Sequence, residues 1–142
     1  MGLVEVQVEL VNSDDLALCA RGYLPHEGVR RVTVSALVDT GACMLAVNED
    51  VRSRLDLKKI DEKEAVLADG SKRKLDVVGP VDVRFENRAT TVRAMVLPGD
   101  TQILLGAIPL EDMDVVVDSR QQRLIVNPES PSIPKTSLRR LA

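Results

Sequence analysis

Short segments in which apolar and polar residues alternate recur along this chain, and they limit its possible folds more than any other feature. Residues 3–11, 32–38 and 81–85 each alternate in this way and are rich in valine. A period of two is typical of half-buried β-strands, and valine favours extended backbone. Apolar residues make up 44% of the 142 residues, enough for one domain with a sizeable aliphatic core. The pattern predicts an all-β fold.

Turn-forming residues separate the expected strands. Residues 12–15 (Asn-Ser-Asp-Asp) form a turn cluster, and we expect a second strand over residues 16–23. Asp69-Gly70 lies between two strand-like runs and is a strong hairpin signal, because glycine tolerates the positive φ of a tight turn. Gly79-Pro80 is expected to break the chain.

One or two short helices interrupt the strands. Asn48 is expected to cap a helix whose first turn contains Glu49 and Asp50, since acidic side chains favour the positive end of a helix. Residues 108–113 are expected to form a single helical turn, with Pro109 tolerated near its start.

The C-terminal part changes in composition. Two valine- and leucine-containing runs, 115–117 and 124–126, predict a terminal hairpin. From Pro128 onward, proline, serine and basic residues dominate. We therefore expect one domain over residues 1–127, followed by a flexible tail over residues 128–142.

Charge and hydropathy exclude several classes of function. The net charge is −3 and charges of both signs are mixed, so no basic stripe predicts nucleic-acid binding. No apolar run approaches the length that spans a membrane. Glu5 and Glu9 make the first eleven residues unlike a signal peptide. The expected location is the cytoplasm.

The cysteines and the histidine predict no cofactor or metal site. Cys19 and Cys43 are too few for a disulfide framework, and no Cys or His pair has the spacing of metal ligands. Cys43 is better explained as a small buried apolar residue than as a reactive thiol, because no basic residue adjoins it. His26 is expected to be exposed in its Pro-His-Glu-Gly loop.

The residues that carry chemistry are Asp39-Thr40-Gly41, which directly follow the apolar end of the strand at 32–38. The strand places the Asp39 carboxylate at the edge of a low-dielectric region, where its charge is costly. Thr40 can donate and accept hydrogen bonds that fix the turn. Gly41 lets backbone approach the carboxylate closely because it lacks a Cβ. A plain turn-capping role in a structural β-barrel is the alternative, since Asp-x-Gly is common in turns.

One carboxylate is not enough for peptide hydrolysis. One group must activate water while a second protonates the substrate oxygen, and two carboxylates that share a site split their titration accordingly. The sequence contains a single Asp-Thr-Gly. A two-fold axis between two chains would supply the second Asp39.

The order of motifs resembles the retropepsin-like aspartic proteases, which include the retroviral proteases and their single-domain prokaryotic relatives. The resemblance covers roughly residues 3–127. It is carried by three runs: residues 37–42 (Leu-Val-Asp-Thr-Gly-Ala), 68–71 (Ala-Asp-Gly-Ser) and 103–106 (Ile-Leu-Leu-Gly). It implies a closed β-barrel with a flap hairpin, an aspartic endopeptidase activity, a homodimer, and a peptide or protein substrate.

The resemblance also implies roles for single residues. Asp39 is similar to the catalytic aspartate, and Thr40 to the residue whose hydroxyl bonds across the dimer axis. Gly41 and Ala42 would line the floor of the cleft, with Ala42 near the substrate. The tip of the flap that closes over bound peptide would contain Ala68, Asp69, Gly70 and Ser71.

Three further features follow from the resemblance. Gly106 is similar to the glycine that packs beside the catalytic loop. The strands at 3–10 and part of 114–126 would pair at the dimer interface. The flap departs from the family pattern because it has no aromatic residue at its tip. A non-catalytic dimerisation or peptide-binding module is therefore the alternative function.

Overall fold

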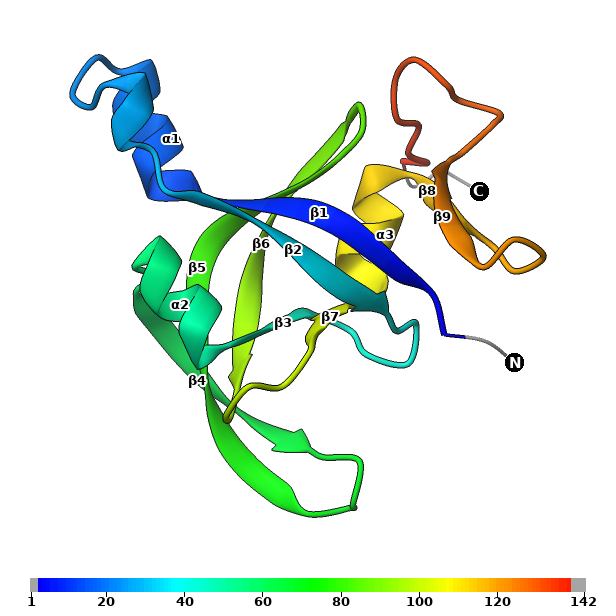
Figure 1. The fold of residues 1–142 in the computed structure, drawn as a ribbon, viewed down its shortest axis with the longest axis horizontal. Helices are drawn as coiled ribbons and strands as arrows, with labels where there is room; N and C mark the ends of the chain where they lie inside the picture. Colours follow the sequence, from blue (N-terminus) through cyan, green and yellow to red (C-terminus); the bar gives the residue numbers. More distant parts are fainter. Residues whose placement is uncertain (1–2, 139–142) are drawn as a thin grey trace.

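The computed structural model describes residues 3–138 and contains a closed β-barrel with short helices around it (Figure 1). The strands are β1 (Glu5–Asn12), β2 (Arg31–Val38), β3 (Leu45–Asn48), β4 (Lys59–Val66), β5 (Lys72–Phe85), β6 (Arg88–Leu97), β7 (Ile103–Leu105), β8 (Val115–Asp118) and β9 (Arg123–Val126). The helices are α1 (Ser13–Ala20), α2 (Glu49–Leu55) and α3 (Ala107–Met113). The prediction of an all-β, retropepsin-like barrel with a flap hairpin is confirmed, with three short α-helices in the described residues.

Strand pairing closes the barrel. The order β1-β2-β7-β3-β6-β5 returns to its start because β1 also pairs with β5. Most neighbours are antiparallel, but β2 runs parallel to β7 and β3 runs parallel to β6. The parallel pairing of β2 with β7 brings the carboxyl ends of both strands to the same edge of the sheet, and this places the chain segments that follow them side by side.

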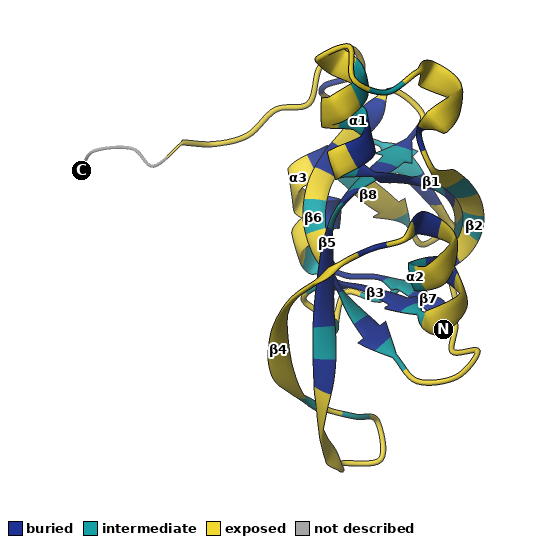
Figure 2. Ribbon diagram, turned by 90° about the vertical axis from the view of Figure 1, so that its left-hand side faces the viewer, coloured by how far each residue is buried: buried dark blue, intermediate teal, exposed yellow. Residues whose placement is uncertain are grey.

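Aliphatic side chains fill the barrel, as the alternating pattern predicts. Leu10, Ala36, Val83, Ala94 and Leu105 are fully buried and belong to one core cluster. Burial of aliphatic side chains stabilises such a core by about 1.5–3 kcal/mol for each large residue. Figure 2 shows the buried strands of the barrel and, in contrast, the exposed strand β4, which projects from the barrel as part of the hairpin with β5.

The prediction of a strand over residues 16–23 is wrong. Residues 13–20 form α1 instead, because Asn12 is its N-cap and its side-chain oxygen accepts a hydrogen bond from the Asp15 backbone N–H at 3.0 Å. Asp15 is buried and accepts a further bond from the Arg30 backbone N–H at 3.0 Å. The polar cluster that predicted a turn is therefore the start of a helix.

The expected chain break at Gly79-Pro80 is also wrong. β5 continues through both residues, and its register against β6 shifts between Val78 and Val81. Proline has no N–H to donate to a ladder, so it is accommodated at this irregularity. Gly79 has a φ of +137°, which disfavours other residues. The strand bends at this point and does not end.

The expectations for the other helices and the last hairpin are confirmed. The Asn48 side chain accepts a hydrogen bond from the Val51 N–H at 2.9 Å and caps α2. α3 begins one residue before the predicted turn, after Gly106. β8 and β9 form the terminal hairpin as an antiparallel ribbon. His26 is exposed in a short 3₁₀ turn, as expected.

The chain after β9 is fastened to the body over its first residues. Asp114 accepts hydrogen bonds from the Ser130 hydroxyl, the Asn127 side chain and the Lys135 backbone N–H. Arg88 is buried; its guanidinium donates to the Ser130 carbonyl, while its Nε and Nη1 atoms have no partner among the described residues. A flexible tail from 128 to 142 stays a prediction, and its last four residues lie outside the described residues.

No helix among residues 3–138 is both long enough and apolar enough to cross a membrane.

Candidate active site

Asp39 lies at the carboxyl end of β2, where the parallel pairing with β7 fixes its main chain. Val38 is in register with Leu105, and the Asp39 backbone N–H donates to the Leu105 carbonyl at 3.0 Å. On the other side, the Val38 N–H donates to the Val4 carbonyl at 2.8 Å. Two hydrogen bonds, to Val4 and to Leu105, therefore fix the main chain where the Asp39 loop begins. Both partners are distant from Asp39 in sequence.

The loop itself is closed around the aspartate. One carboxylate oxygen of Asp39 accepts a hydrogen bond from the Gly41 N–H at 3.0 Å, and its carbonyl accepts one from the Ala42 N–H at 3.1 Å. A Cβ on Gly41 would lie 3.2 Å from that carboxylate oxygen, which is tighter than ordinary contact. This is the close approach that the sequence predicts at Gly41. The Asp39 side chain is half-buried.

Gly106 holds the outgoing part of the loop. A Cβ at this position would lie 2.7 Å from the Ala42 carbonyl oxygen and 2.8 Å from the Cys43 carbonyl carbon. No side chain fits there, and α3 comes so close that the Ala107 and Ile108 N–H groups donate to the Ala42 and Cys43 carbonyls at 2.8 and 2.9 Å. The expected packing of Gly106 beside the loop is confirmed. The first turn of α3 therefore braces the residues that follow the aspartate.

The side chains around the turn differ in exposure. Thr40 is exposed and Ala42 is half-buried. Cys43 is exposed, so its interpretation as a small buried residue is wrong for the single chain. Cys43 contacts α3 through its carbonyl oxygen, which accepts a hydrogen bond from the Ile108 N–H, while the residue itself stays exposed.

The predicted flap is the hairpin of β4 and β5, and its tip is residues 67–71. The Leu67 N–H donates to the Ser71 carbonyl at 2.8 Å, and the Gly70 N–H donates to the Leu67 carbonyl at 2.9 Å. Gly70 has a φ of +85°, as the hairpin prediction requires. Asp69 accepts from the Ser71 hydroxyl at 2.6 Å and the Ser71 N–H at 2.9 Å, and these bonds lower the pKa of Asp69.

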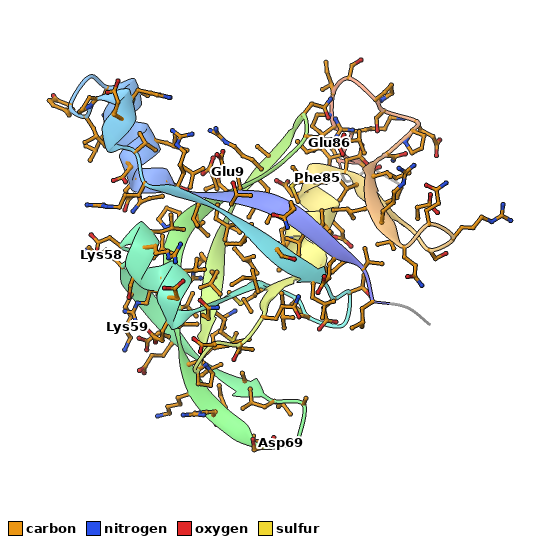
Figure 3. The ribbon with its side chains drawn as sticks, viewed as in Figure 1. Glu9, Lys58, Lys59, Asp69, Phe85 and Glu86 are labelled. Carbon is orange, nitrogen blue, oxygen red and sulfur yellow. The ribbon has the colours of Figure 1, made fainter. Side chains whose placement is uncertain are left out.

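The structure brings the two groups of predicted site residues together only in part. Asp39, Thr40, Gly41 and Ala42 form one turn beside Gly106. Ala68, Asp69, Gly70 and Ser71 form the exposed end of the flap, and Figure 3 shows Asp69 at this end, away from the barrel. Within residues 3–138, no hydrogen bond joins residues 67–71 to residues 39–44. The flap is open.

Among the described residues, no group of three or more His, Cys, Asp or Glu side chains is placed to hold a metal ion.

A family model described as aspartyl protease matches residues 26–107, which is more than half of the chain and includes Asp39 and the whole flap. The chain belongs to the aspartyl protease family. No curated protein matches its sequence.

Two solved structures are similar to this chain. The retroviral protease-like domain of Ddi1 from Leishmania major is 15% identical, with a TM-score of 0.53 over 89% of this chain and 91% of that one. A retropepsin-like aspartic protease from Rickettsia conorii is 16% identical, with a TM-score of 0.48 over 84% of this chain and 90% of that one. The similarity to the Ddi1 domain supports the retropepsin-like fold of this chain.

Sequence reasoning missed the main-chain partners of the loop. Nothing in the residue types shows that the Leu105 carbonyl accepts from Asp39 or that α3 donates to Ala42. The available signal was the apolar run at 103–105 that ends in glycine, because a buried strand of this kind can pair in parallel with the strand before Asp39.

Proposed function

We propose that the chain is an aspartic endopeptidase that works as a homodimer and activates water between two Asp39 carboxyl groups. The observation that carries the proposal is the half-buried Asp39 at the end of β2, held by main-chain bonds on both sides. The family membership supports it. Each chain supplies one such carboxylate, and hydrolysis by carboxylates needs two, so a second copy completes the site.

The two carboxyl groups share one proton. Like charges in contact cannot both ionise, so one Asp39 stays protonated while the other is ionised. The ionised group takes a proton from the water as the water oxygen attacks the peptide carbonyl. The protonated group donates its proton to the carbonyl oxygen. The carboxyl group that now holds the water proton passes it to the leaving nitrogen, and the bond from carbon to nitrogen breaks. The ionised partner takes a proton from a hydroxyl of the diol intermediate, which restores the couple.

The flap is proposed to close over an extended peptide and exclude bulk water. Main-chain groups of the peptide would pair with strand edges, as in β-augmentation. The loop and the flap tip would then meet on the two sides of the peptide. Thr40, Gly41 and Ala42 are proposed to brace and line the floor of the cleft, and Ala68, Asp69, Gly70 and Ser71 its cover.

The dimer surface is proposed to include the β8–β9 ribbon. Within residues 3–138, β8 and β9 pair only with each other, so their outer edges remain available. Val116 and Val117 of β8 are exposed, as is Leu3 before β1. β1 contributes less of its length than the resemblance implies, because its residues 9–12 already pair with β5 on one edge and residues 5–11 pair with β2 on the other.

The test is replacement of Asp39 in the full chain. Asp39→Asn and Asp39→Ala should each abolish cleavage of an unfolded protein substrate, while sedimentation still detects the dimer. Asp14→Asn is the matched control, because Asp14 is exposed in the first turn of α1. Activity that survives both changes at Asp39 would remove this residue from the mechanism.

A second candidate function is a peptide-binding or dimerisation module without turnover. It is favoured by the flap tip, where residues 68–71 are all exposed and none is aromatic. A peptide that binds the dimer and stays intact over a broad pH range would support the module and contradict the protease.

A further inference from the structure

A groove of about 370 Å³ lies outside the catalytic loop, on the side where β6 and the start of α3 meet. Its size is at the lower end of the range for small ligand sites. Five separate parts of the chain form it: the residues after Cys43, the flap strand β4, Pro80 of β5, β6, and the first turn of α3. No residue of the proposed catalytic machinery lines it.

The walls of the groove are mainly apolar. Met44, Val92, Ile108 and Pro109 contribute to them. Ile108 is 54% exposed, although it is a large aliphatic residue on a helix that otherwise buries its apolar side chains. An apolar side chain placed against Ile108 and Met44 would remove their surfaces from water, which is favourable in proportion to the area covered.

The polar lining of the groove is predominantly basic. Lys63 from β4 and Arg93 from β6 both contribute to it, and no carboxylate does. Arg93 donates to Asp61 at 3.0 Å, so its charge is partly neutralised. Among residues 3–138, Lys63 belongs to no ion pair. The lining therefore retains a positive charge beside an apolar wall.

The groove lies next to the loop that follows Asp39. Met44, which lines it, is only two residues beyond Ala42, and the Ile108 N–H donates to the Cys43 carbonyl. Lys63 is on β4, the first strand of the flap. A side chain bound in the groove would therefore contact both the loop and the flap.

We propose that this groove is an accessory substrate site that binds a peptide segment with an apolar side chain next to an acidic one. The proposal rests on the proposed function, because it names a substrate class for the same enzyme. The apolar side chain would lie against Met44 and Ile108, and the carboxylate would pair with Lys63. The chain's own C-terminal segment fits poorly, because Lys135, Arg139 and Arg140 give it the same sign of charge as the groove.

The test measures peptide binding to the full-length Asp39→Asn chain, in which turnover is removed. The probes are two short fluorescent peptides of identical length, one alternating leucine with glutamate and the other alternating leucine with lysine. The glutamate peptide should bind more tightly. Lys63→Glu should weaken its binding by about tenfold and strengthen that of the lysine peptide, because an exposed attraction becomes a repulsion.

Two further variants make the test specific. Arg21→Glu carries the same charge change at an exposed position at the end of α1, outside the groove and the flap, and it should alter binding by less than about twofold. Ile108→Asp should weaken the glutamate peptide without unfolding the chain, since Ile108 is already more than half exposed. Equal effects of Lys63→Glu and Arg21→Glu, or no effect of Lys63→Glu on either peptide, would overturn the proposal.

The experiments distinguish an error in the proposed groove from an error in the proposed protease activity. If the Asp39→Asn chain shows the Lys63-dependent preference but the unsubstituted chain cuts no substrate, the groove stands and the proposed function fails. If the unsubstituted chain cuts substrates with a rate that Lys63→Glu leaves unchanged for acidic and basic sequences alike, the function stands and the groove is contradicted.

Discussion

The loop that begins at Asp39 and the flap tip are both tight turns that contain an aspartate and a glycine, but they are held in opposite ways. The loop at residues 39–43 is bonded to β7 and α3, which are more than sixty residues away in sequence. Within residues 3–138, the hydrogen bonds of the tip at residues 67–71 are formed only inside the tip, between Asp69 and Ser71 and between main-chain groups of residues 67–71. One turn is fixed by the barrel, and the other keeps its shape wherever the hairpin moves.

This difference suits the two proposed roles. A general acid–base pair needs carboxylates that are positioned before the substrate arrives. A cover must open and close, and elements that move are drawn from the less stable parts of a fold. A tip with its own internal bonds moves as a unit without losing its turn, because no bond to the barrel has to break.

The largest expected effect is that of Gly106→Ala. The new Cβ would lie within 2.8 Å of the Ala42 carbonyl oxygen and the Cys43 carbonyl carbon, so the loop must shift. Such overpacking costs about 2–3 kcal/mol of the free energy of unfolding. Urea denaturation of the variant should show this loss, and cleavage should fall strongly because Asp39 is displaced. Unchanged stability would mean that the loop is not braced by α3.

Gly70→Ala is the same chemical change in the other turn, and its effect should be smaller. Nothing lies within 4 Å of a Cβ placed on Gly70, so only the backbone conformation is penalised, by about 1 kcal/mol. Urea denaturation should show at most this loss. A destabilisation as large as that of Gly106→Ala would contradict the independence of the tip from the barrel.

Ser130→Ala extends the comparison to the chain after β9, which is also held by hydrogen bonds to a residue earlier in the sequence, Asp114. The Ser130 hydroxyl, the Asn127 side chain and the Lys135 N–H lower the pKa of Asp114 to about 2. Because this pKa lies below the ordinary value of 3.8, the contribution of Asp114 to stability is present above that value and is lost as the pH falls through about 2. The variant should raise the pKa of Asp114, so its contribution to stability becomes smaller and the acid-induced loss of that contribution ends at a higher pH.

The measurement for Ser130→Ala is an NMR titration of the Asp114 carboxyl together with unfolding curves at several acid pH values. Ser132→Ala is the matched control, since its side chain makes no hydrogen bond in the described residues. An unchanged pKa of Asp114 would show that the tail does not hold this carboxylate.

Ser71→Ala should have the smallest effect. It removes the hydroxyl that contributes most to the lowered pKa of Asp69, while the bond from the residue 71 N–H remains. The pKa of Asp69 should rise part of the way to its ordinary value, and the melting temperature should stay the same. NMR titration of the Asp69 carboxyl measures its pKa, and thermal unfolding measures the melting temperature. A large fall in the melting temperature would show that the flap tip contributes to the stability of the barrel, which would contradict its independence.

The sequence predicts the β-strands well where their environment has two faces. β1, β2 and the last part of β5 alternate because one face packs on the core and the other meets water. α1 could not be predicted from the same pattern, since it is a short helix with little burial, and its cap Asn12 and buried Asp15 are equally typical of a turn. The bend at Gly79-Pro80 likewise has the composition of a chain break, and pairing with β6 before and after the bend keeps the strand intact.

For the site, the sequence locates Asp39 and the flap because these depend on local turn chemistry. It does not reveal what braces the loop, because the partners are main-chain atoms of β7 and α3. It also does not reveal the groove, whose lining residues Met44, Lys63, Arg93 and Ile108 are unremarkable singly and come together only through the barrel.

The most direct test of the shared-proton couple is the activity of mixed dimers. Unsubstituted chain and Asp39→Asn chain are mixed in equal amounts at constant total concentration, allowed to exchange subunits, and assayed for cleavage. If both carboxyl groups are required, only dimers of two unsubstituted chains act, and the rate falls to about a quarter of that of the pure enzyme. A rate of about a half would mean that each chain acts with its own Asp39 and would contradict the account.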